Sequence, residues 1–299
     1  MRKDREGSPS SASVNLVFQS HTVAIQDWHC AGGPVEAEES SDRYHVAVTR
    51  CGAYVREANR ERVLADAATA VFYELGQAYR VSHPVKGGDV CTVFTLPAEG
   101  VRQLVGQYVP AVRDRVLPSF LTSRASVDCR DFLLHRLALS AAFTDVDPLL
   151  AEEAALTFLD RVLRRAYSGE PICQQVTSRS SAALDCAERV RAVVAGGFRQ
   201  TLSLADIARE VGFSAYHLSR LFRSITGDSI HRYLVRVRLR HAIERMLETR
   251  SRLSVIALEV GFASHSHFTD TFKREFGLPP ASVRSLTSRD LREALRRFR

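Results

Sequence analysis

The stretch IAREVGF, Ile207–Phe213, recurs as IALEVGF, Ile256–Phe262, 49 residues further along the chain. Past the Gly-Phe pair the two copies continue to match at an offset of 50, and each then runs to a glycine, Gly227 or Gly277. A short helix, a glycine turn and a second helix in the same order twice predict two helix-turn-helix units. The last third of the chain is therefore expected to be helical.

The first unit carries the signals of a helix-turn-helix in the right order. Ser203 and Ser214 are suited to cap its two helices, Gly212 permits a sharp turn, and Phe213 is expected to plug the core. The buried stripe of the second helix is then Leu218, Leu221, Phe222 and Ile225, at helical spacing. The positions left to face outward are Ala215, Tyr216, Ser219, Arg220 and Arg223.

The second unit has the same layout with an aromatic stripe. Phe268, Phe272 and Phe276 follow one another at intervals of four and are expected to be buried. The positions left to face outward are His265, Ser266, Thr269, Asp270 and Lys273.

These outward positions are suited to double-stranded DNA. A helix in the major groove needs hydrogen-bonding groups near its N-terminus for base edges and cations nearby for phosphates. Arg220 fits guanine, Asp270 fits the amino group of cytosine, and Tyr216 and Thr269 fit thymine methyl groups. Arg223 and Lys273, one turn later, are predicted to contact phosphates. A solvated helix face explains any one of these residues, but it does not explain the repeated turn, cap and plug.

The segment between the two units predicts one long helix over Ser229–Thr249. About 20 residues at 1.5 Å each give roughly 30 Å, close to the roughly 34 Å of one DNA turn. One chain is therefore expected to place both recognition helices in successive major grooves. Four arginines of this helix are expected to meet phosphates or solvent: Arg232, Arg236, Arg238 and Arg240.

Charge and composition agree with a polyanion partner. The 299 residues carry a net charge of +7, with +9 from residue 183 onward and −2 before it. No apolar run has the roughly 18 residues of a membrane span, and the N-terminus lacks an apolar signal core, so we expect a cytoplasmic protein without membrane contact. The six cysteines show no paired spacing, which favours reduced thiols.

The first half of the chain predicts a different architecture. Short β-branched and aromatic runs between about Val14 and Leu96 indicate strands of a small antiparallel barrel or sandwich, and the pattern becomes helical from Val101 to Tyr167. The fold class is α+β. The expected domains are a disordered lead-in (1–13), a sensor and dimerisation domain (14–167), a linker (168–182), a DNA-binding domain (183–286) and a basic helical tail (287–299).

The sequence from about Ala183 to Leu286 resembles the AraC/XylS family of bacterial transcription regulators. The likeness rests on SLADIAREVGFSAYHLSRLFRSITG and on LSVIALEVGFASHSHFTDTFKREFGLPPASVR. It implies a seven-helix DNA-binding domain, frequent dimerisation and frequent contact with RNA polymerase. Matched position by position, base reading falls on Tyr216, Ser219, Arg220, His265, Ser266, Thr269 and Asp270. Asp270 departs from the arginine common there, so the second unit is expected to position the protein more than it specifies sequence.

The N-terminal half is more weakly similar to the cupin-like β-barrel sensor domains of the same family, through VFYELGQAYRVSHPVKGGDVCTVFTL. This likeness implies a small-molecule effector held in the barrel and adjoining helices that form a homodimer. The candidate pocket residues are Trp28, His45, Tyr73, Tyr79 and His83, with His29 as a further candidate, and barrel core or surface is the other explanation for each.

Other functions fit less well. An enzymatic cupin needs clustered histidines for a metal, and the one HxH spacing, His265 and His267, falls on a recognition helix where the two rings point apart. A DNA alkyl-transfer enzyme needs an activated Pro-Cys-His-Arg nucleophile, and Cys173 is in the linker instead. No catalytic residue, cofactor or metal is therefore expected. A regulator controlled by its abundance or by a protein partner, without an effector, remains an alternative.

Overall fold

The computed structural model describes residues 12–33, 38–144, 147–168, 181–284, 291–292 and 295–296. It divides into two compact units, Met1–Arg124 and Ala125–Arg299. Most of the predicted lead-in, the linker between residues 169 and 180, and most of the C-terminal tail lie outside the described residues, although Ala12 and Ser13 already belong to a strand. Among the described residues, no helix combines the length and apolar character of a membrane span.

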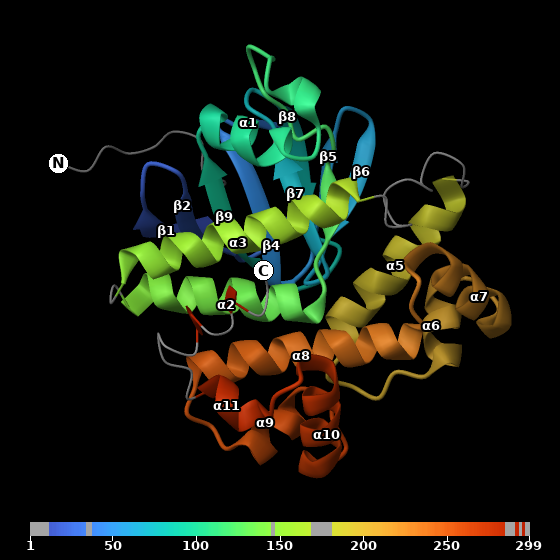
Figure 1. The fold of residues 1–299 in the computed structure, drawn as a ribbon. Coiled ribbons are helices and arrows are strands. Elements are labelled where there is room, and N and C mark those ends of the chain that lie inside the picture. Colours follow the sequence, from blue (N-terminus) through green and yellow to red (C-terminus); the bar gives the residue numbers. More distant parts are fainter. Residues whose placement is uncertain are drawn as a thin grey trace. The chain divides into compact units, whose positions relative to one another are not determined.

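The first unit is built mainly of antiparallel strands (Figure 1). They are β1 (Ala12–Gln19), β2 (Ala24–Cys30), β3 (Glu39–Ser40), β4 (Tyr44–Gly52), β5 (Tyr54–Ala58), β6 (Glu61–Ala65), β7 (Thr69–Tyr73), β8 (Ala78–Ser82) and β9 (Asp89–Leu96). β1, β2, β9, β4 and β7 are neighbours in one sheet, and β3, β8, β5 and β6 form another. The strands predicted from the apolar runs at β4, β5, β7, β8 and β9 are confirmed.

The two sheets share one apolar core. Ala47, Val71 and Val93 come from the first sheet and Tyr54 and Val63 from the second, and all five are buried in the same cluster. Alternation along the strands turns these side chains to one face of each sheet. The closed cupin-like barrel is not confirmed, because the described strands form two separate sheets.

The helical pattern predicted from Val101 onward is interrupted early in the structure. α1 (Ala98–Gly106) ends well before Pro110, and a short 3-10 turn, Pro110–Val112, follows it. Val109 has φ −129° and ψ 87°, in keeping with the steric clash that disfavours a helical residue before proline. The apolar periodicity was correct, but the proline divides it.

The second unit begins with the last part of a short strand, β10 (Arg124–Ser126), and is otherwise helical. Its helices are α2 (Cys129–Thr144), α3 (Pro148–Tyr167), α5 (Ser181–Gly197), α6 (Leu204–Val211), α7 (Ala215–Thr226), α8 (Ile230–Glu248), α9 (Leu253–Glu259), α10 (His265–Phe276) and α11 (Pro280–Arg284). Asp147 caps α3 by accepting a hydrogen bond from Leu150 N, and Pro148 opens the helix.

Helices α2 and α3 pack with the helix-turn-helix region, whereas the sequence assigned them to a sensor domain ending at residue 167. α2 lies between α3 and α8 (Figure 1). Arg161 and Arg165 of α3 donate to the buried Asp131 of α2 at 2.6 and 2.7 Å. On the other side, Arg240 of α8 donates to the Val127 carbonyl at 2.8 Å. These polar contacts explain the grouping, since the apolar pattern of a helix does not reveal its neighbour.

Candidate nucleic-acid interface and ligand cavity

Helices α6 and α7 form the first helix-turn-helix unit. Ser203 caps α6 and Ser214 caps α7, each by accepting a hydrogen bond from a backbone N–H of the first turn. Gly212 ends α6 in the left-handed conformation with φ 75°, which a side chain would strain. Phe213 is half-buried rather than fully inserted in the core. The predicted turn and both predicted caps are confirmed.

The outer face of α7 carries an aromatic and two cations. Leu218 and Phe222 are buried beneath it, while Leu221 and Ile225 are half-buried. Tyr216 is 74% exposed, and the guanidinium of Arg220 lies 5.7 Å from the centre of its ring. A cation at this distance is attracted to the ring face. Arg220 is thereby held beside Tyr216 near the N-terminus of the helix, with the exposed Arg223 one turn later.

Helices α9 and α10 repeat this arrangement. Ser264 caps α10 through His267 N, and Phe262 in the turn is only 3% exposed, so it serves as a core plug more completely than Phe213. Phe268, Phe272 and Phe276 are buried, as their spacing predicted. Their rings contact one another in sequence along the helix, at centroid distances of 5.7 and 4.3 Å.

The outer face of α10 is polar but less basic at its start than that of α7. His265, Ser266, Asp270 and Lys273 are exposed, and Thr269 is half-buried. Thr269 Oγ1 lies 3.5 Å from His265 Nε2, one helical turn away. Asp270 is separated from Lys273 by nearly one turn, so the start of this face presents a carboxylate rather than a guanidinium.

The long helix α8 joins the two helix-turn-helix units and matches the predicted spacer closely. Ser229 caps it, and its 19 residues give a length of about 28 Å. Tyr233, Val237 and Ile243 are buried.

Four arginines of α8 were expected to meet phosphates or solvent, but three of them are buried or half-buried and contact other residues of the C-terminal compact unit. Arg236 pairs with Asp228 and with Glu275, the latter at 2.9 Å. Arg238 donates to the Phe198 and Gln200 carbonyls at 2.8 and 2.9 Å. Arg240 is 2% exposed. Only Arg232 of the four has a largely exposed side chain, at 60%, and it lies 3.4 Å from Asp228. Helical periodicity shows that one face is buried, but α8 is covered on more than one face.

The N-terminal compact unit holds a cavity of about 120 Å³ between its sheets. All five predicted pocket residues lie on its wall, while His29 is half exposed and pairs with Asp27 at 3.0 Å instead. The lining residues are Ala12, Trp28, Cys30, Glu39, His45, Ala47, Tyr54, Tyr73, Tyr79, Val81, His83, Asp89, Cys91 and Val93. The structure thus brings the five candidates together.

Hydrogen bonds order the polar groups of this cavity. Tyr73 donates to the Tyr54 hydroxyl at 3.2 Å, and Tyr79 donates to Glu39 at 2.8 Å. The rings of Tyr73 and Tyr79 meet edge to face at 4.9 Å. Burial raises the pKa of both hydroxyls above their usual value, so they are neutral donors at physiological pH.

His45 is a neutral group of the cavity wall. Burial lowers its pKa to about 4, even though Asp42 acts in the opposite direction. Its Nδ1 lies 3.0 Å from Thr95 Oγ1. The cavity therefore combines neutral polar groups and aromatic rings with the carboxyl groups of Glu39 and Asp89.

Sequence reasoning missed Cys30, Tyr54, Asp89 and Cys91 on this wall. They sit on three different strands, and their common face follows from strand pairing: Trp28 is opposite Cys91, and Cys30 is opposite Asp89. Local patterns do not specify which strands pair, although the alternation of Asp89, Cys91 and Val93 on one face of β9 was visible in the sequence.

Comparisons with known proteins identify the helix-turn-helix region. The profile of a family described as a helix-turn-helix domain matches residues 190–285. The right origin-binding protein of Escherichia coli K12 is 36% identical over 89 residues, which are 30% of this chain and 31% of that protein. The HTH-type transcriptional activator AarP of Providencia stuartii is 34% identical over 91 residues, which are 30% of this chain and 67% of that protein. The chain belongs to the AraC/XylS family of transcription regulators.

The match to each of these two relatives covers 30% of this chain. The match spans about a third of the length of the right origin-binding protein. Among solved structures, a transcriptional regulator from Chromobacterium violaceum with an AraC-type DNA-binding domain is 27% identical, with a TM-score of 0.34, over 36% of this chain and 95% of that one. The names of the two curated relatives describe an origin-binding protein and a transcriptional activator.

Proposed function

We propose that this AraC/XylS-family chain is a sequence-specific, DNA-binding transcription regulator that reads successive major grooves of an operator with α7 and α10. The observation that carries the proposal is the pair of capped helices with exposed polar outer faces, joined by one helix about 28 Å long. That length is close to the roughly 34 Å between successive turns of the major groove.

The first helix-turn-helix unit, α6 and α7, supplies most of the sequence specificity in this proposal. Tyr216, Ser219 and Arg220 read base edges, with Arg220 donating to guanine O6 and N7 and Tyr216 packing on a thymine methyl group. The stacking of Arg220 on Tyr216 supports these roles, because it limits the side-chain freedom that binding would otherwise remove. Arg223 contacts a phosphate.

The second helix-turn-helix unit, α9 and α10, mainly positions the protein on the duplex. His265, Ser266 and Thr269 approach base edges, and Lys273 contacts a phosphate. Asp270 accepts from a cytosine amino group where the operator offers one and is otherwise repelled by the backbone. The exposed carboxylate near the start of α10 supports this division of labour.

The N-terminal compact unit, which contains β1 to β9, acts in this proposal as a cupin-like sensor for a small molecule. Its cavity supports this role, because aromatic walls with a few oriented polar groups are typical of ligand sites. Trp28, Tyr73 and Tyr79 would pack against the effector, while His45 and His83 would offer hydrogen bonds. The sensor domain extends in function to residue 167 and is joined to the DNA-binding domain, 183–286, by the linker 168–182.

The regulator works in the cytoplasm as a homodimer on its operator and touches RNA polymerase. These points rest on the family alone. Dimerisation is testable by measuring mass in solution with and without operator DNA.

Selection of bound duplexes from random double-stranded DNA tests the main proposal. The full-length protein should enrich one motif with two half-sites about 10 base pairs apart, and footprinting should show protection in two successive major grooves. The Arg220→Ala variant should enrich a motif with one position relaxed. Recovery of no motif above the starting pool would overturn the proposal.

A second candidate is a regulator controlled by its abundance or by a protein partner. Titration of small aromatic and carboxylate compounds separates the two, with operator affinity as the readout. A shift that is lost when Tyr79 is replaced by Phe and Trp28 by Ala supports the sensor. If every compound leaves affinity unchanged, the effector-independent candidate is favoured while DNA binding still stands.

A further inference from the structure

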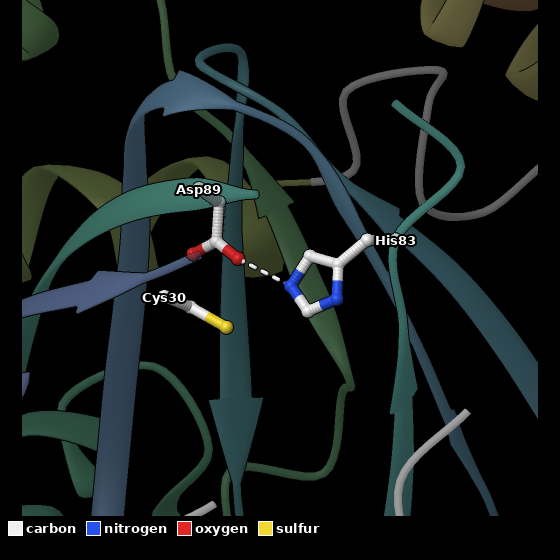
Figure 2. A group of neighbouring side chains, drawn as sticks. All are labelled: Cys30, His83 and Asp89. Atoms are coloured by element: carbon white, nitrogen blue, oxygen red, sulfur yellow. Dashed lines mark hydrogen bonds and ion pairs between the residues drawn. The ribbon is translucent and has the colours of Figure 1, made fainter. Parts of the chain in front are cut away.

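Three side chains of the kinds that bind transition metals converge at one place on the cavity wall. Cys30 ends β2, Asp89 begins β9, and His83 follows β8 (Figure 2). One donor atom from each, the thiol sulfur, a ring nitrogen and a carboxylate oxygen, lies within 4.8 Å of the other two. The three therefore already surround a volume of the size that one metal ion needs.

The sheet itself fixes two of these residues. Cys30 and Asp89 are directly paired across the antiparallel strands β2 and β9, so their side chains leave the same face. His83 comes from outside this pair, and its Nε2 lies 2.7 Å from Asp89 Oδ1, the contact drawn in Figure 2. The side chains of His83 and Asp89 are only 3% and 8% exposed. The group thus combines two residues of paired strands with a third residue that follows β8.

Gly88 allows the chain segments to approach this closely. It has φ +71°, and a Cβ added there would lie 1.9 Å from the Cys30 carbonyl oxygen and 2.5 Å from Gly32 N. Any larger residue would push the end of β2 away from the start of β9. The backbone contact holds Cys30 and Asp89 at a fixed separation.

We propose that Cys30, His83 and Asp89 form a binding site for one divalent transition-metal ion of the zinc class. Thiolate, imidazole and carboxylate are the three protein donors that Zn²⁺ uses, at about 2.0–2.3 Å. Tetrahedral geometry at these lengths separates donor atoms by about 3.3–3.5 Å. The His83–Asp89 separation is shorter than that, so the ring moves away by less than 1 Å when the ion enters.

The ion replaces the hydrogen bond between His83 and Asp89. Cys30 coordinates as the thiolate, and its proton is released to water, so affinity falls at low pH. Because all three residues line the cavity, the fourth position of the ion faces it and is taken by a water molecule. Three protein donors and one open position are typical of a site where a second molecule can bind.

No local sequence pattern indicated the group formed by Cys30, His83 and Asp89. The spacing is 53 residues from Cys30 to His83 and six from His83 to Asp89, with no HxH among them. The expectation of no metal site depended on that missing HxH. Cys91 is a neighbouring thiol, with its Sγ 2.9 Å from Asp89 Oδ2, and it is the natural competitor for the role of Cys30.

Cobalt binding to the full-length, reduced protein tests the proposal without DNA or effector, so its outcome is independent of the proposed function. After removal of metals with a chelator, Co²⁺ should bind at one ion per chain with a thiolate-to-cobalt absorption band in the near ultraviolet. Added Zn²⁺ should abolish the band by displacement.

Variants identify the ligands. Cys30→Ser should remove the thiolate band, and His83→Gln and Asp89→Asn should each weaken Co²⁺ binding by about tenfold or more. Cys51→Ser, which changes a half-buried thiol of β4 in the same sheet but outside the cavity lining, is the matched control and should bind normally. Circular dichroism in chelator verifies that each variant is folded; should Cys30→Ser unfold, the His83→Gln titration decides.

Three results would overturn the proposal. The first is the absence of saturable binding by the wild-type protein. The second is a thiolate band that survives in Cys30→Ser or disappears in Cys91→Ser instead. The third is unchanged affinity in both His83→Gln and Asp89→Asn, which would leave His83 and Asp89 as an ordinary structural pair.

Discussion

Arg136 of α2 and Glu244 of α8 form an ion pair with 2.5 Å between Nε and Oε1, and their side chains are only 4% and 2% exposed. Glu248, one turn further along α8, approaches the same guanidinium at 3.7 Å. A buried ion pair contributes little net stability compared with an apolar pair, but loss of one partner leaves the other charge uncompensated. The pair therefore fixes which face of α8 meets α2.

Replacement of Arg136 by Met should lower the free energy of unfolding by about 3–5 kcal/mol, because Glu244 stays buried without its partner. The double variant Arg136→Met/Glu244→Gln should recover much of the loss. Denaturant unfolding measures both. Arg164→Met in the exposed pair with Asp160 is the control and should change the midpoint little. Equal effects of the single and double variants would contradict this role.

Replacement of Arg220 by Ala should weaken binding to the selected operator by about 1–3 kcal/mol and relax the preference at one base pair. The reason is loss of a bidentate contact to guanine by the side chain that lies beside Tyr216. Affinity for the operator and for its single-base variants should be measured at one salt concentration. Unchanged operator affinity would count against α7 as the recognition helix.

Replacement of Arg223 by Ala should act differently, weakening operator and random DNA alike. A phosphate contact releases counterions, so the slope of log K against log salt should become shallower by about 1. A salt titration with both duplexes measures this. Loss confined to the operator would instead assign Arg223 to base reading.

Replacement of Asp270 by Asn should raise affinity for random DNA at low salt. Removal of one carboxylate near phosphates relieves a repulsion of about 1 kcal/mol, roughly fivefold in affinity. Fluorescence anisotropy with a random duplex gives the answer, and Glu259→Gln outside α10 serves as a control. Weaker operator binding by Asp270→Asn would show instead that Asp270 accepts from a base.

Acid should lower the free energy of unfolding of the C-terminal compact unit through His241. Burial lowers the pKa of this ring from 6.5 to about 3, with Arg199 and Arg240 acting in the same direction. The unfolded chain takes up a proton below about pH 6.5 and the folded chain does not until about pH 3, so stability falls as pH drops through this window.

The slope from this one group reaches at most about 1.4 kcal/mol per pH unit. In His241→Phe, which retains a ring for stacking on Phe198, the pH profile from denaturant unfolding should be flatter. His45 in the first unit, with its pKa lowered to about 4, should preserve part of the dependence. A profile of unchanged slope in His241→Phe would refute the assignment.

The helix-turn-helix units were predictable because their signals are local. Ser203, Gly212 and Ser214 act within a few residues of their own backbone, and the Phe268 stripe follows directly from helical spacing. The same periodicity accounts for the exposure of most candidate DNA-contacting residues, although Ser219 and Thr269 are half-buried. Their roles as base readers remain a prediction.

The rest required tertiary information. The inward arginine Arg240 has the same local pattern as the exposed Arg232, and the difference comes from α2, which lies more than 85 residues earlier in the chain. Likewise, the convergence of Cys30 and His83 depends on how distant strands are placed. Buried polar pairing between distant segments has no period in the sequence.

The inward contacts of α8 have a consequence for the operator. Contacts of Arg236, Arg238 and Arg240 hold this helix against neighbouring segments on several sides. The spacing between the two recognition helices, α7 and α10, is therefore fixed. We expect the promoter to adapt to the protein: inserting or deleting a single base pair between half-sites should impair recognition more than changing a base within the second half-site. During evolution, binding sites would then tolerate base changes in the second half-site more readily than changes in the spacing between half-sites.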